Sequence, residues 1–263
     1  MLALGCDMGA LAAKTVLLED GRLIDHDVTT TDGLLAGAAN VSLQRILDRT
    51  GLTLRDLPRR GGTGWGRKYI NYDHHPETII NCLAAGAFFL RPGARTVVDL
   101  GGLTAAVINL NDQGKVLEYR NNDRCASGTG FFVELAAQAL ELRLEELNRV
   151  VASATGRVHI GAQCAVFGES EIVSHVNQGV EPADILAGVV YAIGAGAATT
   201  VRRLGVVPEI LVSGGVAKLD GVLAALSEKL GVEAVRPEVD PQIVGALGAA
   251  LIAARREPLK GGE

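Results

Sequence analysis

Leu2-Ala-Leu-Gly-Cys-Asp-Met-Gly9 is an apolar run that ends on Asp-x-Gly, and the same pattern returns at Thr96-Val-Val-Asp-Leu-Gly-Gly102. The two aspartates, Asp7 and Asp99, are 92 residues apart. After each run the chain returns as a second apolar segment, passes a glycine turn and extends a third time (residues 14–18, 20–21 and 22–29, then 104–110, 112–114 and 116–120). Each copy is predicted to be a three-stranded meander. An internal duplication is the simplest account of the repeat.

Helices and further strands are expected after each meander. The first half is predicted to hold helices at 34–48 and 77–90, with a glycine-rich turn at 61–66 after another strand. The second half is predicted to hold helices at 131–140, 144–153, 165–177, 182–204 and 224–230, and strands at 209–212 and 233–235. This order predicts an α/β protein with two similar halves facing across a nucleotide cleft. The halves are residues 1–94, completed by a C-terminal helix at about 243–257, and residues 95–242.

The repeated Asp-x-Gly turns predict phosphate chemistry. Glycine lets backbone N–H groups approach phosphate oxygens closely, and the carboxylates of Asp7 and Asp99 can hold a magnesium ion directly or through its waters. A single Asp-x-Gly is most often a plain turn. Two of them at equivalent points of a duplicated unit favour a bound nucleotide.

Two later motifs fit the same ligand. Ser213-Gly-Gly215 follows an apolar strand and offers bare backbone on which a purine ring can lie, although Gly-Gly after a strand is commonly just a turn. Glu169-Ser-Glu171 lies on the expected helix at 165–177. Its carboxylates belong either to a solvated helix face or to a contact with the ribose.

Two cysteine stretches point to a different chemistry. Asn122-Asp-Arg-Cys125-Ala-Ser-Gly-Thr-Gly130 and Gly161-Ala-Gln-Cys164 each precede a predicted helix, whose unpaired N–H groups and dipole favour negative charge. Two cysteines cannot complete an iron-sulfur cluster, but a two-fold axis between two copies would supply the other two. The alternative is that both are buried packing residues, which is our interpretation of Cys6 and Cys82.

Composition limits the protein class. The 263 residues are 48% hydrophobic and carry a formal charge of −5, with no basic run longer than two residues, which argues against a nucleic-acid partner. No apolar run was found to reach the roughly 18 residues that a membrane span needs. Four cysteines without a signal peptide do not indicate a disulfide framework. We therefore expect a cytoplasmic protein with no membrane partner.

Together the motifs resemble one known family, the ATP-dependent activators of 2-hydroxyacyl-CoA dehydratases and the related ATPase subunits of benzoyl-CoA reductase. The resemblance covers nearly the whole chain, and its most specific part is the two cysteine motifs. The motifs that carry it are Asp7-x-Gly9 with Lys14, Gly62-Thr-Gly64, Asp99-x-Gly-Gly102, Asp123-x-Cys125-Ala-x-Gly-Thr-Gly130, Cys164-x-Val-Phe-x-Glu-Ser-Glu171, Ser213-Gly-Gly-Val-Ala217 and Gly245-Ala-Leu-Gly-Ala-Ala250.

The resemblance implies a fold, a cofactor and a set of partners. The fold is an ATPase of the actin, Hsp70 and sugar-kinase type with duplicated RNase H-like halves. One 4Fe-4S cluster per dimer is implied, held by Cys125 and Cys164 of two copies or of a copy and a close paralogue. Driven by ATP with Mg²⁺, an electron would pass from ferredoxin or flavodoxin to an acyl-CoA dehydratase or aryl-CoA reductase component. ATP binding would change the angle between the helices behind the two cysteines.

The resemblance also assigns site residues. Asp7 and Asp99 are the expected catalytic residues. The residues expected to contact ATP or ADP are Gly9, Lys14, Gly101, Gly102, Gly128, Thr129, Gly130, Glu171, Gly214 and Gly215.

The chain departs from the family pattern on the phosphate side. Ala10-Leu11 stands where many members have Ser-Thr, and Leu103-Thr-Ala-Ala106 where they often have polar residues. Three alternatives therefore stay open: an ATPase-weak subunit of a heterodimeric benzoyl-CoA reductase, a nucleotide-binding subunit without turnover, and a sugar or small-metabolite kinase in which Asp99 is the general base.

Overall fold

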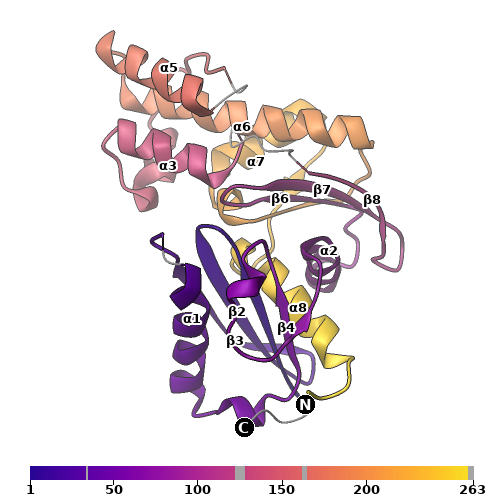
Figure 1. Ribbon diagram of the computed structural model, residues 1–263. Helices are drawn as coiled ribbons and strands as arrows, with labels where there is room; N and C mark the ends of the chain where they lie inside the picture. Colours follow the sequence, from indigo (N-terminus) through magenta and orange to yellow (C-terminus); the bar gives the residue numbers. More distant parts are fainter. Residues whose placement is uncertain (34, 122–127, 162–164, 260–263) are drawn as a thin grey trace. The chain divides into compact units, whose positions relative to one another are not determined.

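The computed structural model describes residues 1–33, 35–121, 128–161 and 165–259, and its contacts divide the chain into two compact units. Unit 1 comprises Met1–Ala94, Leu110–Leu117 and Pro237–Glu263, and unit 2 comprises Arg95–Asn109 and Glu118–Arg236. Each unit is built on one five-stranded sheet with helices packed around it (Figure 1).

These units differ from the expected halves at two places. The turn at 110–117 belongs to unit 1 because it packs on a helix there: a Cβ at Gly114, whose φ is +74°, would overlap the ring of Phe88. Residues 237–242 also belong to unit 1, and the adjoining Ile243 is buried in its core with Ala3 and Val16.

Unit 1 has the sheet order β3-β2-β1-β4-β5. Strand β1 pairs antiparallel with β2 and parallel with β4. The strands are β1 (Leu2–Met8), β2 (Ala12–Glu19), β3 (Arg22–Thr30), β4 (Arg60–Thr63) and β5 (His75–Pro76). The helices are α1 (Leu35–Thr50), α2 (Ile79–Leu90) and α8 (Val244–Ala254), with short 3-10 turns η1 (Leu54–Asp56), η2 (Arg67–Tyr69) and η5 (Pro241–Ile243).

Helix α8 lies so close to this sheet that glycine is required in the strands. A Cβ at Gly5 of β1 would overlap the carbonyl oxygen of Ala246, and one at Gly61 of β4 would overlap that of Ala249. The expected glycine turn at 61–66 is therefore wrong in its first half. Residues 60–63 form the inner strand β4, between β1 and β5, and the turn begins only at Gly64, where φ is +93°.

Unit 2 repeats the topology of unit 1. Its sheet order is β10-β9-β6-β7-β8, and the first strand of its meander, β6, again pairs antiparallel with the second and parallel with the fourth. Both sheets thus run third, second, first, fourth and fifth strand, which supports the duplication. The strands are β6 (Thr96–Leu100), β7 (Ala105–Leu110), β8 (Val116–Asn121), β9 (Ile210–Ser213) and β10 (Ala234–Val235).

The helices of unit 2 surround an apolar core. It includes Phe132, Leu147, Ile172 and Ile185, each of which is less than 2% exposed. The helices are α3 (Gly130–Ala139), α4 (Leu147–Ala152), α5 (Ala165–Asn177), α6 (Pro182–Leu204) and α7 (Asp220–Leu230), with 3-10 turns η3 (Leu144–Glu146) and η4 (Gly215–Lys218).

One helix corrects the expectation about apolar length. The 23-residue helix α6 contains an 18-residue stretch with a mean hydropathy of 1.5, which is long and apolar enough to cross a membrane, so an apolar stretch of that length does exist. Half of this stretch is buried inside unit 2, where residues such as Ile185, Val189 and Ile193 belong to the core. The apolar character of α6 is accounted for by core packing.

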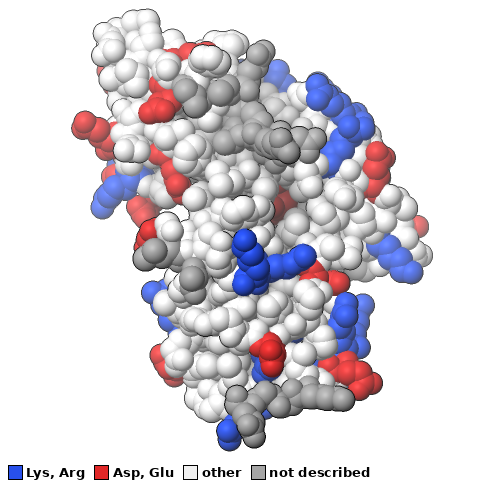
Figure 2. Space-filling view, in the orientation of Figure 1, with Lys and Arg blue, Asp and Glu red and all other residues white. Residues whose placement is uncertain are grey.

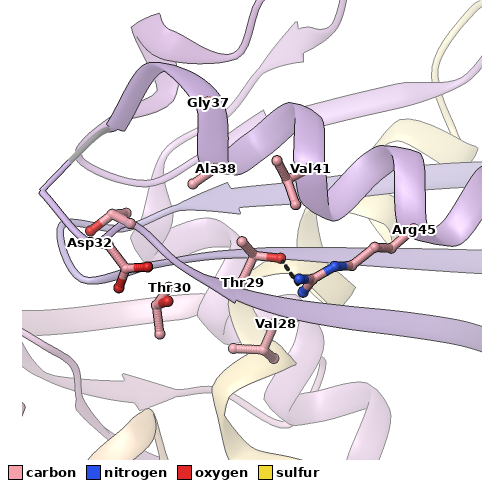
Figure 3. Close-up of a pocket in the computed structure, with 9 residues that line it drawn as sticks. Val28, Thr29, Thr30, Asp32, Gly37, Ala38, Val41 and Arg45 are labelled. Atoms are coloured by element: carbon pink, nitrogen blue, oxygen red, sulfur yellow. Dashed lines mark hydrogen bonds between the residues drawn. The ribbon is translucent and has the colours of Figure 1, made fainter.

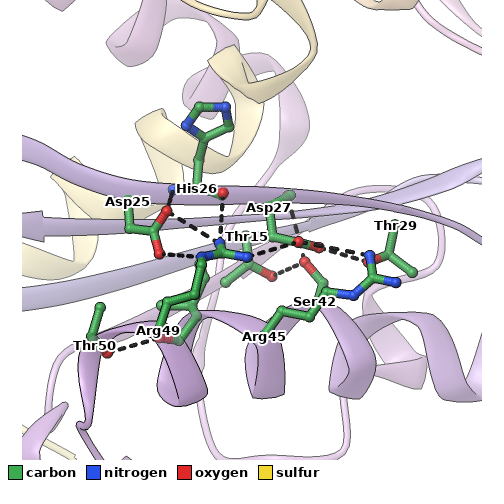
Figure 4. A network of polar contacts seen from close by, with 10 residues as sticks. Thr15, Asp25, His26, Asp27, Thr29, Ser42, Arg45, Arg49 and Thr50 are labelled. Carbon is green, nitrogen blue, oxygen red and sulfur yellow. Dashed lines mark hydrogen bonds and ion pairs between the residues drawn. The ribbon is translucent and has the colours of Figure 1, made fainter.

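A polar network holds α1 to the edge strand β3 (Figure 4). The Arg49 guanidinium donates two hydrogen bonds to the carboxylate of Asp25, at 2.9 and 3.1 Å, and a longer one of 3.5 Å to Asp27. Arg45 donates from Nη1 to the Thr29 hydroxyl at 3.0 Å. The helix is thereby fixed to its sheet by charge as well as by apolar contacts. Elsewhere, Figure 2 shows acidic and basic side chains interspersed over the described residues of one face.

Candidate functional site

The first half-site, Asp7, Gly9, Lys14 and Gly64, lies at the carboxyl end of β1 in unit 1. Asp7 stands opposite Lys14 across the β1–β2 pair, and the Lys14 Nζ lies 2.9 Å from the Asp7 Oδ2. The two side chains are only 13% and 11% exposed. A buried pair of this kind partly neutralises both groups while leaving room for further charge at its surface.

Glycines flank this pair on both sides. A Cβ at Gly64 would overlap the Asp7 Oδ1, and one at Gly9 would lie 2.7 Å from the Lys14 Nζ. A Cβ at Gly245, in the first turn of α8, would lie 3.1 Å from the Asp7 Oδ2. The carboxylate is thus surrounded by bare backbone, which suits the close approach of a magnesium ion or a phosphate.

The loop after Asp7 is held by the end of β3. The Thr31 backbone N–H donates to the Leu11 carbonyl at 3.0 Å, and the Thr31 hydroxyl donates to the Ala10 carbonyl at 2.9 Å. A pocket of about 440 Å³ lies beside this contact, between β3 and α1 (Figure 3). Its polar side chains come from residues 29–32 and from Arg45. This pocket was not expected from the sequence, and it contains none of the predicted site residues.

The second half-site, Asp99, Gly101, Gly102, Ser213 and Gly214, lies at the equivalent end of β6 in unit 2. Asp99 stands opposite Ser213 in the parallel β6–β9 pair, and the fully buried Ser213 hydroxyl donates to the Asp99 Oδ1 at 2.7 Å. A Cβ at Gly214, where φ is +87°, would overlap the carbonyl oxygen of Leu100. The structure therefore brings the turn at 213–215 directly onto the loop that follows Asp99.

This loop is bonded to the first turn of α3. The Gly130 N–H donates to the Gly101 carbonyl and the Phe131 N–H donates to the Gly102 carbonyl, both at 2.8 Å. A Cβ at Gly130 would lie 3.3 Å from the Gly102 Cα. We call these two hydrogen bonds the loop–helix contact. Displacement of the loop must either carry the end of α3 with it or break both bonds.

The loop–helix contact corrects one expectation. We expected unpaired N–H groups at the mouth of this helix, but Gly130 and Phe131 donate to the loop, and Phe132 and Val133 donate to the Thr129 carbonyl at 3.1 and 3.4 Å. Those four donors are not available to a bound anion. Thr129 is fully buried, and Gly128 adopts a φ of +125° with open space around it.

Helices α3 and α5, which follow the two cysteine stretches in the sequence, pack against each other. A Cβ at Gly168 of α5 would lie 2.6 Å from the Cζ of Phe132 of α3, so glycine is what allows this ring to fit. Glu171, which is expected to reach a ribose, accepts a hydrogen bond of 2.6 Å at its Oε2 from the Gly161 N–H. Its carboxylate thus fixes the backbone that leads to the second cysteine stretch.

The four cysteines fall into two groups. Cys125 and Cys164, the predicted cluster ligands, lie outside the described residues. Cys6 and Cys82 are fully buried in unit 1, as their interpretation as packing residues requires. Burial raises the pKa of the Cys6 thiol to about 11 and that of Cys82 to about 12. Among the described residues, no group of three or more His, Cys, Asp or Glu side chains could hold a metal ion.

Comparison with known proteins identifies the family of this chain. The profile of the BadF/BadG/BcrA/BcrD ATPase family matches residues 4–253. The chain belongs to this family. The resemblance seen in the motifs is thereby confirmed.

Individual relatives are similar over almost their whole length. The activator of lactoyl-CoA dehydratase from Anaerotignum propionicum is 36% identical over 259 residues, covering 96% of this chain and 97% of its own. The solved structure of the activator of the 2-hydroxyisocaproyl-CoA dehydratase from Clostridium difficile with bound ADPNP has a TM-score of 0.91 at 33% identity, covering 96% of this chain and 94% of its own.

A more distant likeness concerns the fold alone. A ROK family glucokinase from Streptomyces griseus matches with a TM-score of 0.58 at 16% identity, over 97% of this chain. The expected α/β fold of the actin, Hsp70 and sugar-kinase type is confirmed.

Sequence reasoning missed three contacts of these half-sites. Ser213 was part of a glycine motif, but its hydrogen bond to Asp99 follows only from the parallel register of β6 and β9. Thr31 carries no motif at all. The loop–helix contact is made by backbone groups, which leave no side-chain pattern to find.

Proposed function

We propose that this protein is an ATP-dependent electron-transfer activator. It hydrolyses ATP and passes an electron from ferredoxin or flavodoxin to an acyl-CoA dehydratase or aryl-CoA reductase component. Membership of the family and the names of the similar activators support the ATPase activity and the class of partner. The nucleotide is ATP or ADP with Mg²⁺.

The observation that carries the proposal is the loop–helix contact. Gly101 and Gly102 follow Asp99, where a magnesium ion and phosphate would bind, and their carbonyls hold the first turn of α3. In the sequence, α3 begins five residues after Cys125. A change at the nucleotide phosphate therefore has a direct backbone route to the helix that follows this cysteine.

The cysteine chemistry fits a cluster shared between two copies. Cys6 and Cys82 are neutral buried thiols, because burial raises the pKa of each to about 11 or 12, and thiolate is the form that ligates iron. Cys125 and Cys164 are the two cysteines that remain in the chain. Two copies, or one copy and a close paralogue, would then supply the four thiolates that a 4Fe-4S cluster needs.

When bound, such a cluster supplies one-electron chemistry at low potential. The chain itself supplies the coupling. Glu171 holds the backbone at Gly161, Phe132 packs against Gly168, and the loop–helix contact fixes the start of α3. A movement of the loop would re-aim α3 against α5 and change which N–H groups and side chains face the cysteine stretches.

Purification without oxygen followed by metal analysis tests the proposal. We expect a brown protein with about four irons per dimer. Cys125→Ser and Cys164→Ser should each remove the iron while ADP binding is kept. Cys82→Ala is the matched control, since its thiol is buried in unit 1 and should not affect the iron content. A colourless, iron-free preparation that still binds ADP would refute the redox function.

A second candidate is the ATPase-weak subunit of a heterodimeric benzoyl-CoA reductase. The observation that favours it is Ala10-Leu11, since neither side chain offers a hydroxyl to phosphate or magnesium. A brown protein whose ATP hydrolysis stays negligible until a paralogous subunit is added would support this form of the proposal. The kinase alternative would require a phosphorylated sugar or metabolite to appear with ATP.

A further inference from the structure

Arg67 lies beside the first half-site, and no charged partner for it is found in the described part of the chain. It follows the turn at 64–66, and this turn is fastened to the loop after Asp7 by a hydrogen bond of 2.8 Å from the Gly66 N–H to the Met8 carbonyl. Its side chain is exposed. Within the residues that the structure describes, its guanidinium makes a single long contact of 3.5 Å, from Nη1 to the Glu77 carbonyl.

The Glu77 carbonyl shows where the Arg67 guanidinium lies relative to strand β4. The Glu77 carbonyl also accepts a hydrogen bond of 3.0 Å from the Thr63 hydroxyl. Thr63 is the residue of β4 that stands beside Asp7 in the parallel β1–β4 pair. Arg67 and Thr63 thus share one acceptor, and Thr63 is the strand neighbour of Asp7, so this contact puts the guanidinium on the side of the sheet end where Asp7 lies.

The first half-site has little positive charge of its own to offer a bound phosphate. Lys14 is paired with Asp7 at 2.9 Å, so the two charges largely cancel. Ala10 and Leu11 contribute no hydroxyl. A nucleoside triphosphate brings a highly charged terminal phosphate, and the planar guanidinium of arginine binds two of its oxygens through two parallel N–H donors.

We propose that Arg67 contacts the terminal phosphate of the bound nucleotide and stabilises the charge that develops during hydrolysis. The inference rests on the proposed ATPase function and names a further catalytic residue for it. In the step itself, a water oxygen attacks the γ-phosphorus, the bond to the β-phosphate oxygen breaks with its electron pair remaining on ADP, and the proton of the water is released to solvent. The guanidinium binds γ-phosphate oxygens throughout and takes no proton.

The test compares two neighbouring basic residues on the same turn. Arg67→Gln removes the proposed contact, Arg67→Lys keeps the charge without the two-pronged geometry, and Lys68→Gln is the matched control. Lys68 is also exposed, but its ammonium lies 5.1 Å from the centre of the Tyr69 ring. Trp65 is the sole tryptophan of the chain and is 71% exposed, so its fluorescence can report nucleotide binding at this turn.

The expected pattern separates hydrolysis from binding. Arg67→Gln should lower kcat by about 10²-fold and Arg67→Lys by a smaller factor. The affinity of Arg67→Gln for a non-hydrolysable ATP analogue should fall by about tenfold, while its affinity for ADP stays within about twofold. Lys68→Gln should match the wild type in all three quantities.

Several outcomes would overturn the inference. Hydrolysis by Arg67→Gln at the wild-type rate would do so, as would an equal loss of affinity for ADP and for the analogue. Normal hydrolysis with a lost response to the dehydratase or reductase partner would place Arg67 at a docking surface instead. If the wild type itself does not hydrolyse ATP, the proposed function fails, and the difference between ADP and analogue affinities still decides the role of Arg67.

Discussion

Asp7 and Asp99 occupy equivalent ends of equivalent strands, but their surroundings differ in kind. Opposite Asp7 stand Lys14 and Thr63, and opposite Asp99 stand Ala106 and Ser213. The first carboxylate is paired with an ammonium at 2.9 Å, and the second accepts a hydroxyl hydrogen bond at 2.7 Å. The first half-site thus balances its own charge.

The loops after the two aspartates are also held differently. In unit 1, Thr31 at the end of β3 bonds the loop at Ala10 and Leu11, and α1 is fixed separately to the sheet through Arg45 and Arg49. In unit 2 the loop is bonded to the first turn of α3 itself. The two units therefore share a topology but differ in how a helix is attached. In unit 1, α1 is attached to the sheet, and in unit 2, α3 is attached to the loop that follows Asp99. We infer that unit 2 transmits the nucleotide state.

The largest effect should come from Asp99. Asp99→Asn removes the carboxylate that is proposed to hold the magnesium ion at the second half-site, and it should lower ATP hydrolysis by roughly 10³-fold. The matched change Ser213→Ala removes the hydrogen bond to Asp99 and should lower hydrolysis by about tenfold at most. Steady-state hydrolysis rates measure both. Iron content should not change in either variant, and a bleached Asp99→Asn protein would show that the nucleotide and redox roles are not separable.

The second largest effect should be a difference in alkylation rate between the thiols of the two units. The raised pKa of about 11 for Cys6 and about 12 for Cys82 keeps both thiols protonated near pH 8. In iron-free protein, alkylation of Cys6 and Cys82 should be at least about 10²-fold slower than that of Cys125 and Cys164, because thiolate is the reactive form. Peptide mapping after timed iodoacetamide treatment measures the four rates. The rate for Cys6 should rise with pH up to about 11, and equal rates for all four at pH 8 would contradict the contrast.

Breaking the loop–helix contact should uncouple unit 2 without emptying its site. A Cβ at Gly130 lies 3.3 Å from the Gly102 Cα, so Gly130→Val must push the loop and the helix apart. We expect partner-directed electron transfer to fall by about tenfold more than nucleotide affinity falls. Gly196→Ala is the control, because that helical glycine has open space around it and its replacement should only stabilise α6. A Gly130→Val protein with normal electron transfer would remove the contact from the mechanism.

The smallest effect concerns the fastening of α1 in unit 1. Arg49→Met deletes the two hydrogen bonds to Asp25, but the guanidinium is 44% exposed and its charge is screened by water. The free energy of unfolding should fall by at most about 1 kcal/mol, and the loss should shrink as salt is added. Chemical denaturation at two ionic strengths measures it. Hydrolysis and electron transfer should stay unchanged, and a large loss of either would give α1 the transmitting role assigned to α3.

Much of this fold could be predicted from side-chain patterns. The bounds of α5 and α6 were predicted at their observed residues, and the repeated Asp-x-Gly runs correctly indicated two equivalent sheets. Gly61 was assigned to a turn because glycine in a strand is normally a breaker, whereas here the close approach of α8 requires it. The donors at the start of α3 were expected to be free because nothing in a sequence shows that a distant backbone carbonyl will occupy them.

Hydrogen exchange at the amides of Gly130 and Phe131 tests the central claim most directly, since these two N–H groups make the loop–helix contact. Exchange is compared with saturating ADP and with a saturating non-hydrolysable ATP analogue. We predict a change of at least about tenfold at both amides between the two nucleotides, and no change at Arg45 and Arg49 of α1. Equal exchange at Gly130 and Phe131 in the two bound states would contradict the account.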